Sequence, residues 1–385
     1  MTTPILLHYI NSEVQSSDAA IRRIELPNKG ALHAAIVKVK CTNGATGGRA
    51  KNIFTDVLDK IEIRGDSSKI LLSQYPKDFE KWFETLNGEG MQIVENQGAD
   101  AVQEAVFPIM FGREIYDPEM FLPLSHWDDV KLELEFSPTI AADSGFATGT
   151  VTFDVMLLMT MEDANLPYQG TLITRTMKEH TTVVSGVEEF ELPGDSLIRM
   201  IGNYVYEAGI ADGVDVTKIE LKDKSSGNSL FVADWAEFIA FNRQLFGADI
   251  THYAELFLTD NEVWASRIGE ILNLSVEMEE TVDTTNDEVD FVNVDAIAGD
   301  TLTFDVFNVD ITAASETMTA SSTDRAIRVA ATGKSPSCFG LIPFNYVDTP
   351  DNYLRTSDWG RLIIEYTQGG AGGQLYTTIQ EFETL

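Results

Sequence analysis

The residues with the clearest potential for chemistry are a serine nucleophile block and an acid–histidine pair. Residues 194–197 spell G-D-S-L around Ser196, and Asp249 and His252 form a D-x-x-H pair. A serine nucleophile needs a base within hydrogen-bond reach and an oxyanion hole on a rigid turn. Hydrolases with these two motifs build them on an α/β sheet, whereas Ser196 follows a Pro-Gly turn in a chain without a βαβ pattern. We therefore predict a structural turn at Ser196 and no enzymatic activity, and keep a serine hydrolase as an alternative.

No other residues have the spacing of a metal or cofactor site. The Gly-rich stretch Gly44–Lys51 lacks the G-K-[ST] ending of a phosphate-binding loop. The histidines lack the H-x-H or H-E-x-x-H spacing of a zinc site; they are His8, His33, His126, His180 and His252. Four acids are dense enough to hold calcium loosely but lack EF-hand spacing; they are Asp283, Asp287, Glu288 and Asp290. We predict no catalytic, cofactor-binding or metal-binding residue, with a structural calcium ion as the alternative to a solvated acidic face.

The acidic charge of the chain restricts its partners. The 61 Asp and Glu residues against 27 Lys and Arg residues produce a formal net charge of −34. Residues 1–64 hold nine basic and six acidic residues, so the other 18 basic and 55 acidic residues carry all of the negative charge. A surface this acidic repels nucleic acid and anionic lipid over most of its area. We expect no direct binding of nucleic acid, and a particle that stays dispersed in salty water.

The length of 385 residues allows two domains, each large enough to bury its own core. Cys41 and Cys338 lie far apart and outside any C-x-x-C pair, which predicts two free thiols in a reducing compartment. The longest apolar stretch, Val155–Met161, is too short to cross a bilayer, and the first residues do not resemble a signal peptide. We expect a soluble, folded chain.

Short alternating runs of apolar and polar residues indicate antiparallel β-strands with one buried face. Four of these runs are Ala35–Lys40, Lys131–Phe136, Thr150–Val155 and Thr301–Val306. Clusters of Gly, Asn, Asp and Pro separate them, as the turns of an all-β protein require. Two segments instead have the apolar spacing of a helix, Lys77–Leu86 and Asp234–Phe246. Their aromatic residues are expected to pack each helix against its own β-domain; they are Phe79, Trp82, Phe83, Trp235 and Phe238.

An internal repeat relates the two halves of the chain. Each half has an E-L-P entry segment, a strand, a polar Gly/Ser turn, one of the two helices and a closing pair of strands. Matching landmarks are separated by 166 residues (Pro27 and Pro193), 158 residues (Lys60 and Lys218) and 159 residues (Gly88 and Gly247). This nearly constant separation indicates the duplication of one β-domain.

The second copy is longer at one place. From the helix end to the next matching strand, the first copy has 23 residues (Gly88 to Phe111) and the second has 97 (Gly247 to Phe344). The extra residues contain strand-like runs and 18 acidic against four basic residues between 248 and 343. We interpret them as a solvent-facing elaboration of the second domain.

This arrangement resembles the double jelly-roll major capsid proteins of membrane-containing icosahedral viruses, of corticovirus and tectivirus type. The likeness depends on the E-L-P segments, the strand, turn and helix of Lys60–Gly88, the linker Ile173–Lys178 and the strand Leu362–Tyr366. It covers most of the chain except residues 248–343. It implies an all-β fold of two tandem eight-stranded jelly-roll barrels, each with a short helix, and a long insertion in the second barrel.

The resemblance divides the chain into an N-terminal arm (1–21), a first jelly roll (22–165), a linker (166–187) and a second jelly roll (188–385) with an insertion or tower within 248–343. It implies a viral major capsid protein without catalysis, found in the virion and, during assembly, in the host cytoplasm. Three copies would form a pseudo-hexagonal homotrimer within an icosahedral shell over an internal membrane.

The same resemblance implies contacts with neighbouring capsomers and with penton and minor capsid proteins. Contact with the internal membrane is expected at the base of the barrels, where Arg22 and Arg23 could lie near lipid headgroups. The alternative from a different class is a carbohydrate- or receptor-binding β-sandwich protein, such as a spike.

Overall fold

The computed structural model describes residues 6–384 with gaps. The segments outside the described residues are 46–52, 67, 88–90, 95–99, 143–144, 161–165, 207–212, 247–249, 258–262, 266–270, 281–289, 293–299, 308–313, 321–325, 334–338 and 345–347. Strands dominate the described residues, and among them no helix is long and apolar enough to span a membrane.

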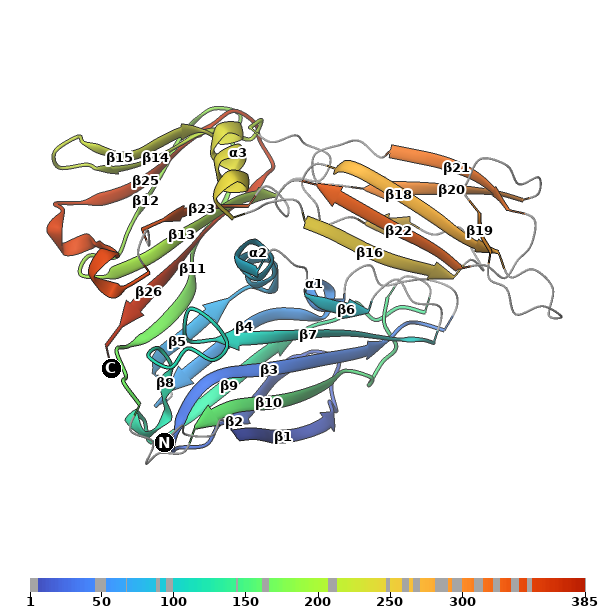
Figure 1. The fold of residues 1–385 in the computed structure, drawn as a ribbon, viewed down its shortest axis with the longest axis horizontal. Coiled ribbons are helices and arrows are strands. Elements are labelled where there is room, and N and C mark those ends of the chain that lie inside the picture. Colours follow the sequence, from blue (N-terminus) through green and yellow to red (C-terminus); the bar gives the residue numbers. More distant parts are fainter. Residues whose placement is uncertain are drawn as a thin grey trace.

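The first barrel consists of two sheets that face each other (Figure 1). One sheet has the order β1 (Leu6–Val14), β10 (Thr152–Thr160), β3 (Ala31–Thr42), β7 (Val102–Met110) and β6 (Gln92–Val94), and β8 (Leu122–Pro123) also pairs with β3. The other sheet has the order β2 (Ala20–Glu25), β9 (Val130–Phe136), β4 (Leu58–Gly65) and β5 (Lys69–Gln74).

The second barrel repeats this pattern. Its first sheet has the order β11 (Thr171–Thr181), β26 (Gln374–Glu383), β13 (Leu197–Tyr206) and β23 (Gly340–Pro343), and β24 (Leu354–Arg355) also pairs with β13. Its second sheet has the order β12 (Gly186–Glu191), β25 (Leu362–Gln368), β14 (Val216–Asp223) and β15 (Ser229–Asp234). Four strands of each sheet correspond between the two barrels, which makes eight matching strands in each barrel as the sequence predicts; β6, β8 and β24 are additional short strands.

The two barrels share one continuous sheet of nine strands. β5 of the first barrel and β11 of the second barrel lie side by side and run parallel, with Ser73 opposite Arg175. The remaining strand pairs within the barrels are antiparallel. The contact that joins the two barrel sheets is short, because Ser73 and Arg175 are the one residue pair that connects β5 with β11 in the described structure.

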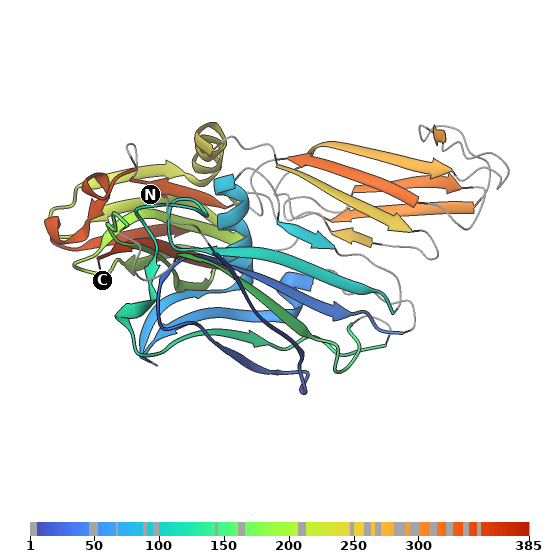
Figure 2. The same cartoon turned by 60° about the horizontal axis from the view of Figure 1, so that its bottom comes forward.

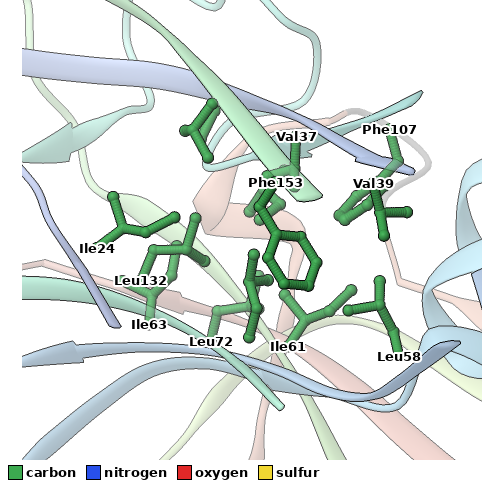
Figure 3. Close-up of a cluster of buried hydrophobic side chains, with 14 of the residues drawn as sticks. Ile24, Val37, Val39, Leu58, Ile61, Ile63, Leu72, Phe107, Leu132 and Phe153 are labelled. Atoms are coloured by element: carbon green, nitrogen blue, oxygen red, sulfur yellow. The ribbon is translucent and has the colours of Figure 1, made fainter. Parts of the chain in front are cut away.

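Apolar and polar residues alternate along the strands, so the apolar side chains of each barrel point into its interior. In the first barrel, Val37 and Val39 of one sheet point toward Ile61, Ile63 and other residues of the opposite sheet (Figure 3). The second barrel has its own core, which includes Ile201, Ile219 and Ile364, all less than 2% exposed. Two separate cores explain why each half of the sequence repeats the same apolar pattern.

In the residues that the structure describes, three α-helices and three 3-10 turns accompany the strands. They are α1 (Ile53–Val57), α2 (Pro76–Asn87), α3 (Trp235–Phe246), η1 (Leu124–His126), η2 (Pro350–Asn352) and η3 (Thr356–Asp358). The two helices expected from the sequence are present, with ends within one residue of the prediction. The five-residue helix α1 was not expected, because one turn is too short for apolar periodicity to be recognised.

A third β-rich unit projects from the second barrel (Figure 2). It has one sheet of β16 (Ile250–Phe257), β22 (Ala326–Gly333), β18 (Ile271–Glu280) and β19 (Asp290–Val292), and another of β17 (Val263–Ala265), β20 (Asp300–Phe307) and β21 (Ala314–Ala320). This unit corresponds to the insertion expected from the sequence.

Three segments that the expected division assigns to the arm, the linker or the insertion form strands of the barrel sheets. In the expected N-terminal arm, β1 pairs with β10 in the first barrel. In the expected linker, β11 pairs with β26 in the second barrel, and at the end of the expected insertion β23 pairs with β13. Each of these strands covers an edge that would otherwise leave backbone groups unpaired. The exact domain boundaries stay a prediction.

Candidate functional site

Ser196 lies in a tight turn just before β13. The preceding residue, Asp195, has a left-handed backbone with φ of 75°. The amide of Ser196 donates to Thr356 Oγ1 at 2.7 Å, and its hydroxyl donates to Glu381 Oε1 at 2.6 Å. Arg175 Nη1 lies 3.0 Å from the other oxygen of Glu381. The hydroxyl therefore joins an ion pair that links β11, β13 and β26.

A cavity of about 430 Å³ opens beside Ser196. It is lined by Asp195, Ser196, Leu197, Arg355, Ser357, Glu381, Phe382, Glu383 and Thr384. No histidine is among these lining residues, all of which the structure describes. A carboxylate such as that of Glu381 is a much weaker base than the histidine that activates a serine nucleophile. The geometry favours a structural turn over a nucleophile.

The D-x-x-H pair contributes nothing to this site as far as the chain is described. Asp249 lies outside the described residues, and His252 is placed only as a backbone position in β16, opposite Ala331 of β22. The hydrolase motif is thus split between the second barrel and the projecting unit. We expect a fluorophosphonate probe to leave Ser196 unlabelled, as measured by intact mass. Labelling that Ser196→Ala abolishes would contradict a structural role.

The other residues considered for chemistry lie apart from one another. His33 is buried, with Nδ1 3.1 Å from the carbonyl oxygen of Asp117, and its pKa is lowered by burial. His180 Nδ1 lies 3.7 Å from Glu188. Cys41 is buried, with Sγ 3.3 Å from Thr150 Oγ1, and Arg23 pairs with Glu133 at 2.8 Å. Within the described part of the chain, no three His, Cys, Asp or Glu residues come together as a metal site.

Several sequence-selected residues fall outside what the structure describes. Cys338, most of Gly44–Lys51 and three of the four clustered acids (Asp283, Asp287 and Glu288) lie in undescribed segments. Asp290 is placed only as a backbone position in β19. The possibility of calcium there stays a prediction.

The most elaborate arrangement of polar groups lies at the junction of the two barrels. Helix α2 belongs to the first barrel, and Phe79 packs into that barrel's core. Trp82, however, packs against Tyr204, Phe339 and neighbouring residues of the second barrel, and its indole nitrogen donates to Thr378 Oγ1 at 2.5 Å. The expectation that Trp82 packs against its own barrel was wrong, because the outer face of α2 is covered by the second barrel.

A buried acid and a buried lysine accompany Trp82 at this junction. Asp78 accepts hydrogen bonds from the hydroxyls of Tyr204, at 2.5 Å, and Thr176. The ammonium of Lys81 lies 4.0 Å from the centre of the Tyr204 ring, which is a cation–π contact. Burial raises the pKa of Asp78 to about 6 and lowers the pKa of Lys81 to about 8. The charged forms of both groups are thus disfavoured in the folded chain.

These shifts predict a specific pH dependence of stability. The contribution of Asp78 to the free energy of unfolding is most favourable below pH 4 and is lost as the pH rises through 6. The reason is that the folded state binds the proton of the Asp78 carboxyl more tightly than the unfolded state does. The contribution of Lys81 is most favourable above pH 10.5 and is lost as the pH falls through 8. The free energy of unfolding of the wild type, minus that of Asp78→Asn/Lys81→Met, should therefore be lowest between pH 6 and 8.

Urea unfolding at pH 5, 7 and 9.5 measures this difference. As a control, Glu189→Gln/Lys224→Met removes a more exposed ion pair. The difference in the free energy of unfolding between the wild type and this variant should not change between pH 6 and 9. A flat profile for the Asp78/Lys81 pair as well would contradict the assignment.

Two arginines form a second polar link between the barrels. Arg199 of β13 holds the carboxylate of Asp348 with Nε at 2.9 Å and Nη2 at 2.5 Å, and donates from Nη1 to Gln380 at 2.6 Å. Arg113, in the first barrel, donates to the backbone oxygen of Asp348 at 3.1 Å. Burial would raise the pKa of Asp348, but the hydrogen bonds and charge of Arg199 lower it overall, so Asp348 is ionised. Planar bidentate pairs of this kind fix the geometry of the groups they join.

Sequence reasoning did not identify this junction. Asp78 and Lys81 are residues of the kind expected on the solvent-facing side of a helix, so their positions in the sequence did not indicate burial. The apolar residues of α2 likewise form one stripe of ordinary width, as expected for a helix that covers a single barrel.

Comparison with known proteins supports the architecture. No family model matches the chain, and no curated protein sequence is similar to it. Among solved structures, PBCV-1 VP54, fitted into a reconstruction of the virophage Sputnik, has a TM-score of 0.59 at 10% identity and covers 99% of this chain and 94% of its own. A chain of the Sulfolobus Turreted Icosahedral Virus structure has a TM-score of 0.57 at 11% identity, with coverage of 98% and 90%.

The major capsid protein P2 from bacteriophage PM2 is also similar, with a TM-score of 0.51 at 9% identity and coverage of 99% and 98%. Each likeness spans both barrels. The chain therefore has the double jelly-roll fold that is found in these viral capsid proteins.

Proposed function

We propose that the chain is a viral major capsid protein without catalytic activity. The observation that carries this proposal is the pair of like barrels locked together by one nine-stranded sheet and by the buried contacts of α2. A rigid pair of equivalent barrels is the unit from which three chains can build a tile with six similar corners. Similar folds in viral capsid proteins, which match this chain along almost its whole length, support the same role.

The proposed capsomer is a homotrimer that tiles an icosahedral shell over an internal membrane. The projecting unit, residues 250–333, would form a tower on the outer surface, where its acidic composition keeps neighbouring particles apart. The barrel ends opposite the tower would face the membrane. Arg23 forms an ion pair with Glu133, so its positive charge is already balanced within the chain. The proposed contact with lipid headgroups therefore requires other groups as well.

Purified protein tests the proposal directly. Light scattering coupled to size exclusion should report a stable trimer, and negative-stain micrographs should show particles with a hexagonal outline. Monomers at all accessible concentrations, or particles that bind a glycan array specifically, would favour the alternative of a receptor-binding β-sandwich.

A further inference from the structure

The two barrels have the same backbone at one corner, where β3 or β13 begins and β10 or β26 ends. In the first barrel the amide of Leu124 donates to the carbonyl oxygen of Gly30 at 2.9 Å, and in the second barrel the amide of Thr356 donates to that of Ser196, also at 2.9 Å. The short strands β8 and β24 pair with β3 and β13 just before these hydrogen bonds. Gly30 and Ser196 are therefore equivalent positions, with the same separation as the two E-L-P segments.

The side chains at this corner differ between the two barrels. Three pairs of residues occupy equivalent places in the paired strands; they are Gly30 and Ser196, Pro123 and Arg355, and Met159 and Glu381. The first member of each pair is apolar, whereas the second is charged or has a hydroxyl group. The second barrel thus has a polar corner where the first barrel has an apolar one.

The corner of the first barrel is filled by its own residues. A Cβ atom at Gly30 would lie 2.5 Å from the backbone oxygen of Thr160 and 3.1 Å from Cε of Met159, so only glycine fits there. In the second barrel, Ser196 places a side chain at the equivalent position, and its hydroxyl donates to Glu381. The packing of Met159 against Gly30 has no counterpart at Ser196, where the cavity of about 430 Å³ opens instead.

Two glutamates that line this corner cavity are balanced within the chain. Glu381 pairs with Arg175 at 3.0 Å. Glu383 also pairs with Arg175, at 3.0 Å, and with Lys69 of the first barrel, at 2.8 Å. Their negative charges are already compensated, so they offer little repulsion to an anionic group that enters the cavity.

Two further charged residues of the corner cavity have no such partner. Arg355 and Asp195 both line the cavity and are exposed. Within the described part of the chain, neither side chain makes a hydrogen bond or an ion pair. An unpaired arginine is unusual in a chain with 61 acidic and only 27 basic residues. The guanidinium of Arg355 and the carboxylate of Asp195 are therefore both available to an external ligand.

These groups fit a ligand that has both signs of charge. A guanidinium holds phosphate oxygens through several N–H donors, and the hydroxyls of Ser357 and Thr384 line the same cavity as further donors. The carboxylate of Asp195 accepts hydrogen bonds from an ammonium group. A phosphodiester joined to an ethanolamine group has both parts, and a cavity of about 430 Å³ has the size of a small-molecule site.

The position and charge of the chain indicate the source of this ligand. The cavity lies beside the C-terminal end of β26, at the end of the barrels away from the projecting unit (Figure 1). In the role proposed above, this end faces the internal membrane. A chain with a net charge of −34 repels an anionic bilayer, whereas a zwitterionic headgroup has no net charge to be repelled.

We infer that the corner cavity of the second barrel binds the phosphoethanolamine group of a zwitterionic lipid, with the phosphate on Arg355 and the ammonium on Asp195. The chemistry of the site rests on the described residues, and the membrane as its source rests on the proposed function. This site supplies a cation that is free to bind lipid, unlike Arg23, whose charge is balanced by Glu133. A single headgroup contact is weak, but three in one trimer engage the same bilayer together.

Titration calorimetry with soluble glycerophosphoethanolamine tests the site in the full chain. The wild type should bind this probe, and Arg355→Gln should weaken binding by about tenfold or more, as expected when a charged hydrogen-bond donor is lost. Arg361→Gln is the matched control and should leave binding unchanged, because Arg361 is exposed, pairs with Glu191 and does not line the cavity. Absence of binding by the wild type, or binding that does not depend on Arg355, would overturn the inference.

A second variant tests the assignment of the ammonium group. The wild type should prefer glycerophosphoethanolamine to glycerophosphoglycerol, a phosphodiester without an ammonium group. Asp195→Asn should remove this preference and keep the fold, because asparagine readily adopts the left-handed backbone found at Asp195. A preference that survives in Asp195→Asn contradicts the role of Asp195, and tighter binding of glycine than of the phosphodiester contradicts the assignment of a phosphate.

Vesicle flotation distinguishes a membrane from a free ligand. Vesicles that contain phosphatidylethanolamine should carry the wild type but not Arg355→Gln, and vesicles of phosphatidylglycerol should carry neither. Binding of the soluble probe without binding of vesicles would overturn the lipid source. A trimer that binds neither would overturn the site and leave the capsid role intact, whereas a chain that binds both but never associates would support the site and contradict the capsid role.

Discussion

Replacing Trp82 with alanine should lower the free energy of unfolding by about 3–5 kcal/mol, the range found when a large buried aromatic side chain is truncated. Trp82 is 4% exposed, and its ring packs edge-on against Phe339 with centroids 5.8 Å apart. The variant leaves a cavity between the two barrels and deprives the Thr378 hydroxyl of a donor. Calorimetry and urea unfolding measure the loss.

Two control variants separate the causes of this effect. Trp82→Phe keeps most of the volume but removes the indole donor, and should cost about 1 kcal/mol, the usual value of one hydrogen bond. Trp359→Ala removes the same side chain from a site that is 37% exposed and should cost clearly less than Trp82→Ala. An equal loss for both alanine variants would mean that Trp82 does not join the barrels.

Replacing Arg199 with methionine should lower the free energy of unfolding by about 3 kcal/mol, because removal of one partner leaves the other charge of a buried pair uncompensated. The Arg199 side chain is 7% exposed, and the Asp348 side chain is 31% exposed, which limits the loss to the lower end of the expected range. Tyr353 would continue to donate to Asp348 at 2.8 Å. Urea unfolding at pH 7 measures the change.

The surface pair of Arg361 and Glu191 provides a matched control. Both side chains are about half exposed, at 48% and 54%, and Arg361 holds the carboxylate with two nitrogens. Arg361→Met should cost clearly less stability than Arg199→Met, because solvent screens an exposed pair. If both methionine variants lose the same stability, then burial of the Arg199 pair does not determine its contribution.

Strand and helix positions were predictable from the sequence for local reasons. The run Lys131–Phe136 alternates because one face of β9 lies in the core and the other carries ions, and this alternation is written in neighbouring residues. The helices were recognised because Phe79 and Phe238 recur at helical spacing with their neighbours. The matching order of these elements revealed the duplication before any contact was known.

The structural role of Ser196 could be argued from the sequence only in part. The sequence places G-D-S-L in a β-rich region, which is the wrong setting for a hydrolase, but it does not show what the hydroxyl of Ser196 contacts. Its partner, Glu381, is 185 residues away along the chain, and the pairing exists only because β13 and β26 are neighbours in a sheet.

By itself, the sequence determined that the chain is built from two copies of one β-domain with an acidic insertion, since composition, alternation and repetition are properties of local stretches. Only the tertiary structure decided that the outer face of α2 is buried while the equivalent face of α3 is open. The two helices have nearly the same apolar pattern, and what covers each of them depends on how the barrels are placed in space. That placement arises from the parallel contact of β5 with β11 and from the buried groups around Asp78 and Arg199, which residues far apart in the chain create together.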